Sequence, residues 1–140
     1  MIIFGASGDL TKRKLMPALY SLYREKRLTG EFSILGIGRT VYSDDNYRSY
    51  ILEELQQFVK SEEQDTALMA SFVSHLYHLP MDPAKEEGYP QLRQRLVELT
   101  NEVDPDNLLF YLATPPSLYG VVPLYLKAAG LNTCLLYTSD

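Results

Sequence analysis

The chain has 140 residues, 46% of them hydrophobic and 22% charged, and a formal net charge of −5. This length and composition are typical of one globular domain, and the acidic balance argues against a broad nucleic-acid surface. No apolar run is long enough to cross a bilayer, and the single cysteine, Cys134, excludes an internal disulfide and paired cysteine ligands for a metal. Because no signal peptide precedes the first apolar segment, we expect a cytoplasmic protein without a membrane or nucleic-acid partner.

The chain opens on an apolar segment, residues 1–4, with the composition of a buried strand. Residues 5–10 read Gly-Ala-Ser-Gly-Asp-Leu, and a helical pattern runs over residues 9–26. Because Pro17 fits only the first turn of a helix, we expect residues 9–16 to form a turn or a short separate helical piece. This order of strand, glycine-bearing turn and helix is typical of a dinucleotide site, where backbone approaches phosphate closely and free amides face the anion.

The remaining pattern alternates strands and helices. Strands are predicted over residues 32–37, 75–81, 108–113 and 131–137, and helices over residues 44–60, 64–72, 89–103 and 118–129. Residues 43–45, Ser-Asp-Asp, are expected to supply the N-cap of the helix that runs to about residue 60. The alternation predicts an α/β fold: a doubly wound, Rossmann-like parallel sheet covered on both faces and truncated after about the fifth strand. We expect residues 1–137 to be a NAD(P)-binding domain that is incomplete at both ends, because the first strand is short and the chain stops soon after its last apolar run.

The turn at residues 5–8 carries a Gly-x-x-Gly pattern, which alone also fits any tight strand-to-helix turn. Its place after the first strand and before the basic run at residues 12–14 favours a phosphate site, although Ile3 stands where the common three-glycine fingerprint has its first glycine. The basic run could equally be a solvated helix face. Asp9 is expected to cap the amides of its own turn.

Arg39 follows the second predicted strand, where dinucleotide folds contact the adenosine ribose. An acidic residue there binds the 2′-hydroxyl of NAD, whereas an arginine accommodates the 2′-phosphate of NADP. Arg39 therefore predicts NADP as the cofactor, the alternative being a solvated surface arginine. Residues 114–116, Thr-Pro-Pro, follow the fourth predicted strand at the end where ligands bind in open sheets, but prolines also suit a rigid loop that only starts a helix.

Three segments resemble the glucose-6-phosphate dehydrogenase family. Residues 2–20 are similar to the family's N-terminal signature, in which a Gly-Ala-Ser/Lys-Gly-Asp-Leu turn precedes basic residues and a helix started by proline. Residues 36–39 match its Gly-x-x-Arg, and residues 110–119 are similar to its Tyr-Leu-Ala-x-Pro-Pro segment. The three segments occur in order over residues 2–119, which is most of the chain.

The resemblance implies which residues bind NADP. The turn and the helix start would wrap the pyrophosphate through Gly5, Ala6, Ser7, Gly8, Asp9, Leu10, Thr11 and Lys12. Lys14 and Arg39 would hold the 2′-phosphate. Pro80 and Met81 would reach the adenine side, and Tyr119 would lie near the cofactor.

The resemblance also implies an activity, the oxidation of glucose 6-phosphate to 6-phosphogluconolactone with reduction of NADP in the pentose phosphate pathway. Three features of the family are absent, however: the Glu-Lys-Pro segment after the fifth strand, the Arg-x-Asp-His-Tyr-x-Gly-Lys motif, and the large antiparallel-sheet domain that forms its dimer. Residues 134–140 depart from the family altogether. We therefore expect no catalytic residue within the chain, which would be an inactive piece of a homo-oligomeric enzyme.

The sequence leaves two alternative hypotheses to weigh. A non-enzymatic sensor that responds to NADP would carry the same sequence up to Tyr119. A short-chain dehydrogenase or epimerase is disfavoured, because the Tyr-x-x-x-Lys pair of those folds does not occur; Tyr23, for example, is followed at that spacing by Arg27.

Overall fold

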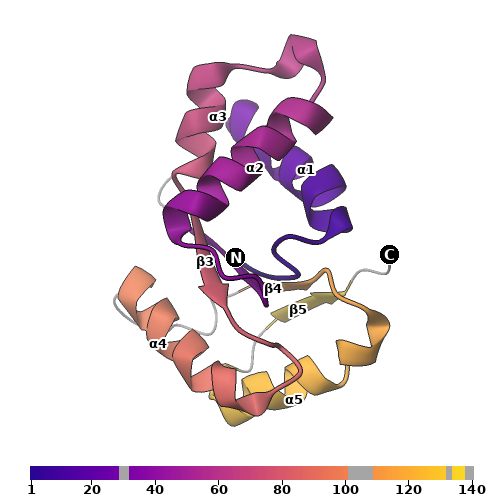
Figure 1. Ribbon diagram of the computed structural model, residues 1–140, viewed down its shortest axis with the longest axis vertical. Coiled ribbons are helices and arrows are strands. Elements are labelled where there is room, and N and C mark those ends of the chain that lie inside the picture. The colour runs from indigo at the N-terminus through magenta and orange to yellow at the C-terminus, as the bar shows by residue number, and fades with distance from the viewer. Residues whose placement is uncertain (29–31, 101–108, 132–133, 138–140) are drawn as a thin grey trace.

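A five-stranded parallel sheet forms the centre of the molecule in this computed structural model, which describes residues 1–28, 32–100, 109–131 and 134–137 (Figure 1). The strands are β1 (Ile2–Phe4), β2 (Ile34–Gly38), β3 (Leu76–Pro80), β4 (Leu109–Leu112) and β5 (Cys134–Tyr137). Their order is β3-β2-β1-β4-β5, so β1 lies at the centre between β2 and β4. The strand order therefore reverses between β1 and β4, which is where ligands bind in sheets of this kind.

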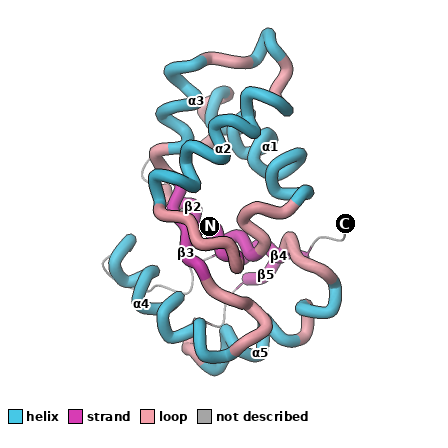
Figure 2. Tube along the Cα trace, in the orientation of Figure 1, coloured by secondary structure: helices cyan, strands magenta, loops and turns pink. Residues whose placement is uncertain are grey.

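Helices cover both faces of the sheet, as Figures 1 and 2 show. One face carries the π-helical segment η1 (Thr11–Leu15) with α1 (Met16–Arg24), α2 (Asp44–Phe58) and α3 (Thr66–Val73). The other face carries α4 (Tyr89–Thr100) and α5 (Val121–Ala128). This arrangement confirms the predicted doubly wound α/β sheet. None of the described helices has the length and apolar character needed to cross a membrane.

The short central strand β1 is buried on both of its faces. Ile3 packs into the layer of α1, α2 and α3, whereas Ile2 and Phe4 pack into the layer of α4 and α5. The ring of Phe4 lies 6.2 Å from that of Phe110 and 6.3 Å from that of Tyr89. Burial on two faces explains why the strand reads as a continuous apolar run, and it fixes the point from which the glycine turn departs.

The helix starts follow the local signals in the sequence. Pro17 lies in the first turn of α1, as expected, but the predicted helical piece before it is not separate, because η1 runs directly into α1 and Leu15 and Met16 both have helical backbone angles. The side chain of Ser43 accepts a hydrogen bond from the backbone nitrogen of Asn46 at 3.1 Å, which confirms the N-cap of α2. The start of α5 was predicted too early: it begins at Val121 rather than at residue 118. Pro123 has no N–H to donate, so it must sit in the first turn of its helix.

Several predicted boundaries differ from those observed. β2 begins at Ile34 rather than at residue 32, and β5 begins at Cys134 rather than at residue 131. Residues 101–103 of the predicted fourth long helix, and residue 108 of the strand that follows it, lie outside the described residues. The same holds for residues 138–140 of the predicted tail.

Candidate functional site

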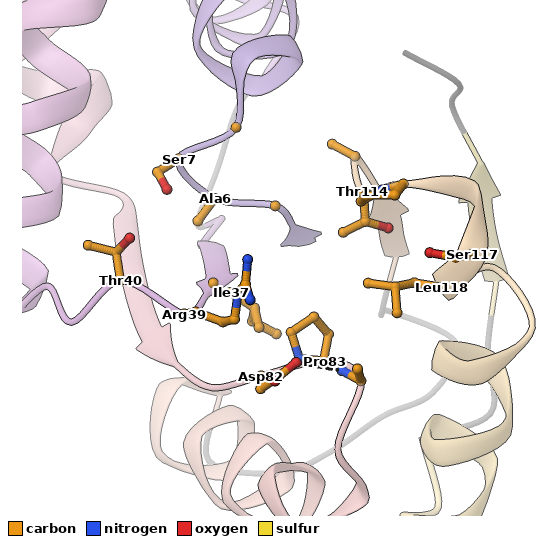
Figure 3. A pocket seen from close by; sticks show the side chains of 16 residues that line it. Ala6, Ser7, Ile37, Arg39, Thr40, Asp82, Pro83, Thr114, Ser117 and Leu118 are labelled. Atoms are coloured by element: carbon orange, nitrogen blue, oxygen red, sulfur yellow. Dashed lines mark hydrogen bonds between the residues drawn. The ribbon is translucent and has the colours of Figure 1, made fainter.

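A cleft of about 490 Å³ opens at the carboxyl ends of the central strands (Figure 3). Segments that follow four of the five strands line it. They are Gly5, Ala6, Ser7 and Gly8 after β1; Ile37, Gly38, Arg39 and Thr40 at the end of β2; Asp82, Pro83 and Ala84 after β3; and Ala113, Thr114, Pro115, Ser117 and Leu118 after β4. The cleft lies where the strand order reverses, and its volume suits a small organic ligand or cofactor.

The glycine turn needs its glycines for close approach of the backbone. Gly5 has φ +99°, and a Cβ there would lie 2.2 Å from the carbonyl oxygen of Ala113. A Cβ on Gly36 of the neighbouring strand would lie 2.8 Å from Cβ of Ala6 and 2.8 Å from the hydroxyl of Tyr47. The turn is therefore held against the ends of both strands that flank β1.

Part of the turn's hydrogen-bonding capacity is used internally. The carbonyl oxygen of Ile37 accepts from the backbone nitrogens of Gly5 at 2.9 Å and Ala6 at 3.0 Å. The backbone nitrogen of Gly8 donates to the carbonyl of Gly5 at 3.1 Å. These three amides shape the turn and are already engaged, which narrows the set of donors that can face a ligand.

The helix start supplies the donors that are left. Helical structure begins at Asp9, and the first amides of a helix have no partner within the helix. The backbone nitrogen of Lys12 is the first to donate within the helix, to the carbonyl of Gly8 at 3.1 Å, so those of Asp9, Leu10 and Thr11 are available to an anion. The nitrogen of Ser7, in the turn itself, also has no backbone partner among the described residues, and the helix dipole adds positive potential at the same place.

The carbonyls of the turn are turned inward and capped by side chains. Hydroxyl groups donate to them from Thr11 to Gly5 (2.7 Å), from Tyr47 to Ala6 (2.9 Å) and from Tyr50 to Ser7 (3.4 Å). Burial raises the pKa of Tyr47, which keeps its hydroxyl protonated as a donor. These side chains occupy the carbonyls of Gly5, Ala6 and Ser7, and the amides of Gly5, Ala6 and Gly8 are engaged as well, so the turn itself leaves the amide of Ser7 and the helix start supplies the other donors.

Arg39 is the cationic side chain that lines the cleft. It is exposed, and its side chain extends beside the glycine turn in Figure 3. Among the described residues, no carboxylate lies within ion-pairing distance of it. By contrast, Arg13 of the basic run pairs with Asp9 at 2.7 Å. The guanidinium of Arg39 can therefore pair with an anionic ligand without first breaking an ion pair to these residues.

A family model described as "Glucose-6-phosphate dehydrogenase, NAD binding domain" matches residues 2–138. The chain belongs to the glucose-6-phosphate dehydrogenase family. It is 45% identical over 133 residues to the glucose-6-phosphate 1-dehydrogenase of Aggregatibacter actinomycetemcomitans and 35% identical over 135 residues to that of Bacillus subtilis. Each alignment covers 94% of this chain and 26% of the relative, so the chain spans about a quarter of the length of these relatives.

Solved structures show the same fold. The crystal structure of glucose-6-phosphate 1-dehydrogenase from Mycobacterium avium matches with a TM-score of 0.83 and 25% identity, over 97% of this chain and 28% of that chain. A glucose-6-phosphate dehydrogenase in complex with its substrate glucose-6-phosphate matches with a TM-score of 0.79 and 32% identity, over 99% of this chain and 28% of that chain. The chain is therefore similar to one continuous α/β portion of these larger enzymes.

The residues singled out from the sequence occupy two zones in this family member. Gly5, Ala6, Ser7, Gly8 and Arg39 line the cleft. The others lie outside its lining: Asp9, Leu10, Thr11, Lys12 and Lys14 are on the helix that follows the turn, Pro80 ends β3, Met81 is buried beneath α4, and Tyr119 packs against the same core. Asp9 was expected to cap the amides of its own turn, but its carboxylate pairs with Arg13, and among the described residues no turn amide donates to it.

The residues predicted from the sequence at the end of β3, Pro80 and Met81, stop one residue before the lining of the cleft, which begins at Asp82. The backbone nitrogen of Met81 donates to the carbonyl of Gly38 at 2.9 Å, so strand pairing continues through Met81 and the cleft wall begins at Asp82. The available signal was the Asp-Pro pair itself, because such pairs commonly begin turns at strand ends. Among the described residues, no group of histidine, cysteine, aspartate and glutamate could hold a metal ion.

Proposed function

We propose that this chain is the NADP-binding part of a glucose-6-phosphate 1-dehydrogenase. The observation that carries the proposal is the position of Arg39, at the end of β2 in the same cleft as an amide-presenting turn at the end of β1. An arginine at this place favours the 2′-phosphate of NADP over the bare ribose of NAD. The family membership of the chain supports a nicotinamide cofactor of one or the other kind.

The cofactor fits the cleft residues as follows. The pyrophosphate would bind the free amides of the turn and helix start, with Lys12 nearby, and the 2′-phosphate would bind Arg39 with help from Lys14. The adenine would lie toward Pro80, Met81 and the loop that begins at Asp82. The nicotinamide would lie toward the segment after β4, near Tyr119.

In the whole protein, we propose that glucose 6-phosphate is oxidised at its C1 hydroxyl to 6-phosphogluconolactone. Bound NADP supplies the hydride acceptor. This chain's residues bind and orient the cofactor, and none of them is assigned as the base that takes the hydroxyl proton. That base and the substrate-phosphate contacts would lie outside residues 1–140, so the chain alone is expected to be inactive. The names of the relatives support this reaction, as does the similarity to a glucose-6-phosphate dehydrogenase solved in complex with glucose-6-phosphate.

The proposed function also implies a cellular location, an oligomeric state and a set of partners. We propose a cytoplasmic enzyme that forms a homo-oligomer through a domain outside this chain and has no nucleic-acid or membrane partner. Residues 1–137 would then be its cofactor-binding domain.

The test is a titration of the chain with NADP and with NAD. Arg39→Ala should weaken NADP binding by about tenfold to a hundredfold, the range expected for a charge-assisted hydrogen bond, and leave NAD binding unchanged. Arg27→Ala serves as the matched control, because Arg27 is exposed, pairs with Glu25 and does not line the cleft. Equal affinity of the wild type for both cofactors, or no effect of Arg39→Ala, would overturn the assignment of the 2′-phosphate.

The activity is tested separately with the full-length protein that contains this chain. Reduction of NADP that depends on glucose 6-phosphate is the expected result. A full-length protein that binds NADP but does not oxidise glucose 6-phosphate would instead be the non-enzymatic sensor.

A further inference from the structure

His78 lies in the middle of β3 and is buried beneath α2, with 4% of its surface exposed. Its Nε2 is 2.8 Å from the carbonyl oxygen of Thr40, and its ring packs 5.0 Å from that of Tyr47 and 5.3 Å from that of Tyr42. Because a carbonyl oxygen can only accept, the imidazole must carry its hydrogen on Nε2. His78 therefore donates a hydrogen bond from β3 to the loop that follows β2.

The surroundings of the ring favour this tautomer. The other ring nitrogen, Nδ1, is buried and has no hydrogen-bond partner among the described residues. A hydrogen on Nδ1 in place of Nε2 would leave the carbonyl of Thr40 without its donor. Burial lowers the pKa of His78, so the ring is neutral near pH 7 and offers a single N–H.

The main chain of His78 donates a hydrogen bond to Asp44 on α2, and Arg95 on α4 in turn pairs with Asp44. The backbone nitrogen of His78 donates to Oδ1 of Asp44, at the start of α2, at 2.9 Å. Oδ2 of Asp44 pairs with Nη2 of Arg95, on α4, at 2.5 Å. The imidazole is thus attached to a fixed point of the sheet edge, and the bond that it donates can hold a loop in place.

Two hydrogen bonds from β3 and the residue after it hold the main chain on either side of Arg39. The carbonyl of Gly38 accepts from the backbone nitrogen of Met81 at 2.9 Å, and the carbonyl of Thr40 accepts from His78 at 2.8 Å. Arg39 lies between these two anchored carbonyls, while its own side chain is exposed in the cleft. The first bond extends the strand ladder, whereas the second is a side-chain hydrogen bond from His78 to the main chain directly after Arg39.

We infer that His78 is a positioning residue for cofactor preference: its Nε2–H anchors Thr40 and thereby holds the guanidinium of Arg39 at the cleft. This inference rests on the proposed function, in which Arg39 pairs with the 2′-phosphate of NADP. An anchored loop loses less conformational entropy when the phosphate binds. NAD has no 2′-phosphate, so its binding gains little from the anchor, and loss of the anchor reduces the preference for NADP.

The rival explanation is that His78 only fills space in the core, and two substitutions separate the explanations. His78→Phe keeps a flat ring against Tyr42 and Tyr47 but removes the donor. His78→Gln keeps a donor, because the amide nitrogen of glutamine is the same number of bonds from Cβ as Nε2 of histidine. A packing role tolerates phenylalanine better than glutamine, whereas an anchoring role requires the reverse.

The experiment combines a measurement without cofactor and one with cofactor on the 140-residue chain. Amide hydrogen exchange over residues 39–42 reports on the loop alone, and dissociation constants for NADP and NAD report on preference. For His78→Phe we expect exchange over this segment to rise about fivefold and NADP binding to weaken about fivefold, the size of one net hydrogen bond, with NAD binding changed by less than about twofold. His78→Gln should restore both values.

His75→Phe is the matched control. His75 also contacts a backbone carbonyl, that of Phe32 at 2.9 Å, and stacks on the ring of that residue, but it does not line the cleft. This variant should leave the exchange of residues 39–42 and the preference for NADP unchanged.

Three outcomes would overturn the inference: unchanged exchange in His78→Phe, equal weakening of NADP and NAD binding, or failure of glutamine to restore the preference. A wild-type chain that does not prefer NADP would overturn the proposed function and with it the cofactor role of His78. The exchange measurement identifies that case, because it reports whether His78 anchors the loop with no cofactor present.

Discussion

The hydroxyl of Tyr47 reaches the carbonyl of Ala6, 2.9 Å away, through the space that Gly36 leaves by having no side chain. A Cβ at Gly36 would lie 2.8 Å from that hydroxyl and equally close to Cβ of Ala6. Helix α2 therefore supports the turn of β1 directly, across the neighbouring strand β2. This contact explains why a fully buried tyrosine stands on α2, where an aliphatic side chain would fill the core but leave the carbonyl unpaired.

Tyr47→Phe is expected to lower the free energy of unfolding by about 1–2 kcal/mol. The substitution leaves the ring in place but removes the hydroxyl that donates to the buried carbonyl of Ala6, and an unsatisfied buried acceptor carries a desolvation penalty. Urea denaturation followed by circular dichroism measures the change. Tyr50→Phe is the control, because its hydrogen bond to Ser7 is long at 3.4 Å and its side chain is only partly buried, so the loss should be under about 0.5 kcal/mol. Equal losses in the two variants would contradict this account.

Gly5→Ala is expected to destabilise the chain by more than about 3 kcal/mol or to prevent folding. At φ +99° an alanine is strained, and its Cβ would meet the carbonyl oxygen of Ala113 at 2.2 Å. Gly120→Ala is the matched control, since a Cβ there would find nothing within 4 Å and the backbone conformation is an ordinary one. That control should be neutral or should stabilise the chain by up to about 1 kcal/mol. A soluble Gly5→Ala chain with a wild-type melting temperature would refute the packing described for the turn.

The fold was predictable because its signals are local. The apolar run around Ile3 and the N-cap at Ser43 each report on a few neighbouring residues, and both predictions were confirmed. The place of the cleft also followed, because parallel strands bring their carboxyl ends to one edge.

The support of the site could not be predicted, because its contacts are distant in sequence. Tyr47 and Ala6 are 41 residues apart, and His78 and Thr40 are 38 residues apart. No periodicity in the sequence indicates that a tyrosine in the first turn of a helix or a histidine in a strand donates to a loop carbonyl. The amides of the turn show the same limit: the sequence indicates a phosphate turn but does not indicate that Ile37 already engages Gly5 and Ala6.

Asp44→Asn is expected to cost about 1 kcal/mol of stability. The amide oxygen can still accept from the backbone nitrogen of His78, but the charge that pairs with Arg95 is lost, and both side chains of this pair are largely buried. Asp45→Asn is the matched control, because it removes a carboxylate from the same helical turn and therefore has the same effect on the helix dipole. The side chain of Asp45 is 92% exposed, and its pair with Arg48 should contribute little. Denaturant unfolding of both variants at low and high salt measures the difference, and equal losses would show that the pair of Asp44 with Arg95 contributes nothing.

Stability is expected to fall as the pH drops below about 6.5, and part of this fall is assigned to His78. Burial lowers the pKa of His78 from its ordinary value of 6.5, while the backbone of Thr40 and Gly36 and the carboxylate of Asp44 oppose the shift only in part. The unfolded chain therefore binds the proton first. The contribution of this group is complete above about pH 6.5 and is lost as the pH falls toward the lower pKa of the folded state, with a slope bounded by about 1.4 kcal/mol per pH unit.

The measurement is the free energy of unfolding of wild type and His78→Gln at pH 7.5 and at pH 5.5. The two proteins differ only at residue 78, so the difference between their pH dependences isolates the contribution of His78. The aromatic neighbours do not interfere, because burial raises the pKa of Tyr47 and its hydroxyl keeps its proton throughout this range. The wild type should lose more stability than the variant on acidification. An identical loss in both proteins would contradict this prediction. It would mean that the His78 ring is solvated in the native state, although only 4% of the residue's surface is exposed.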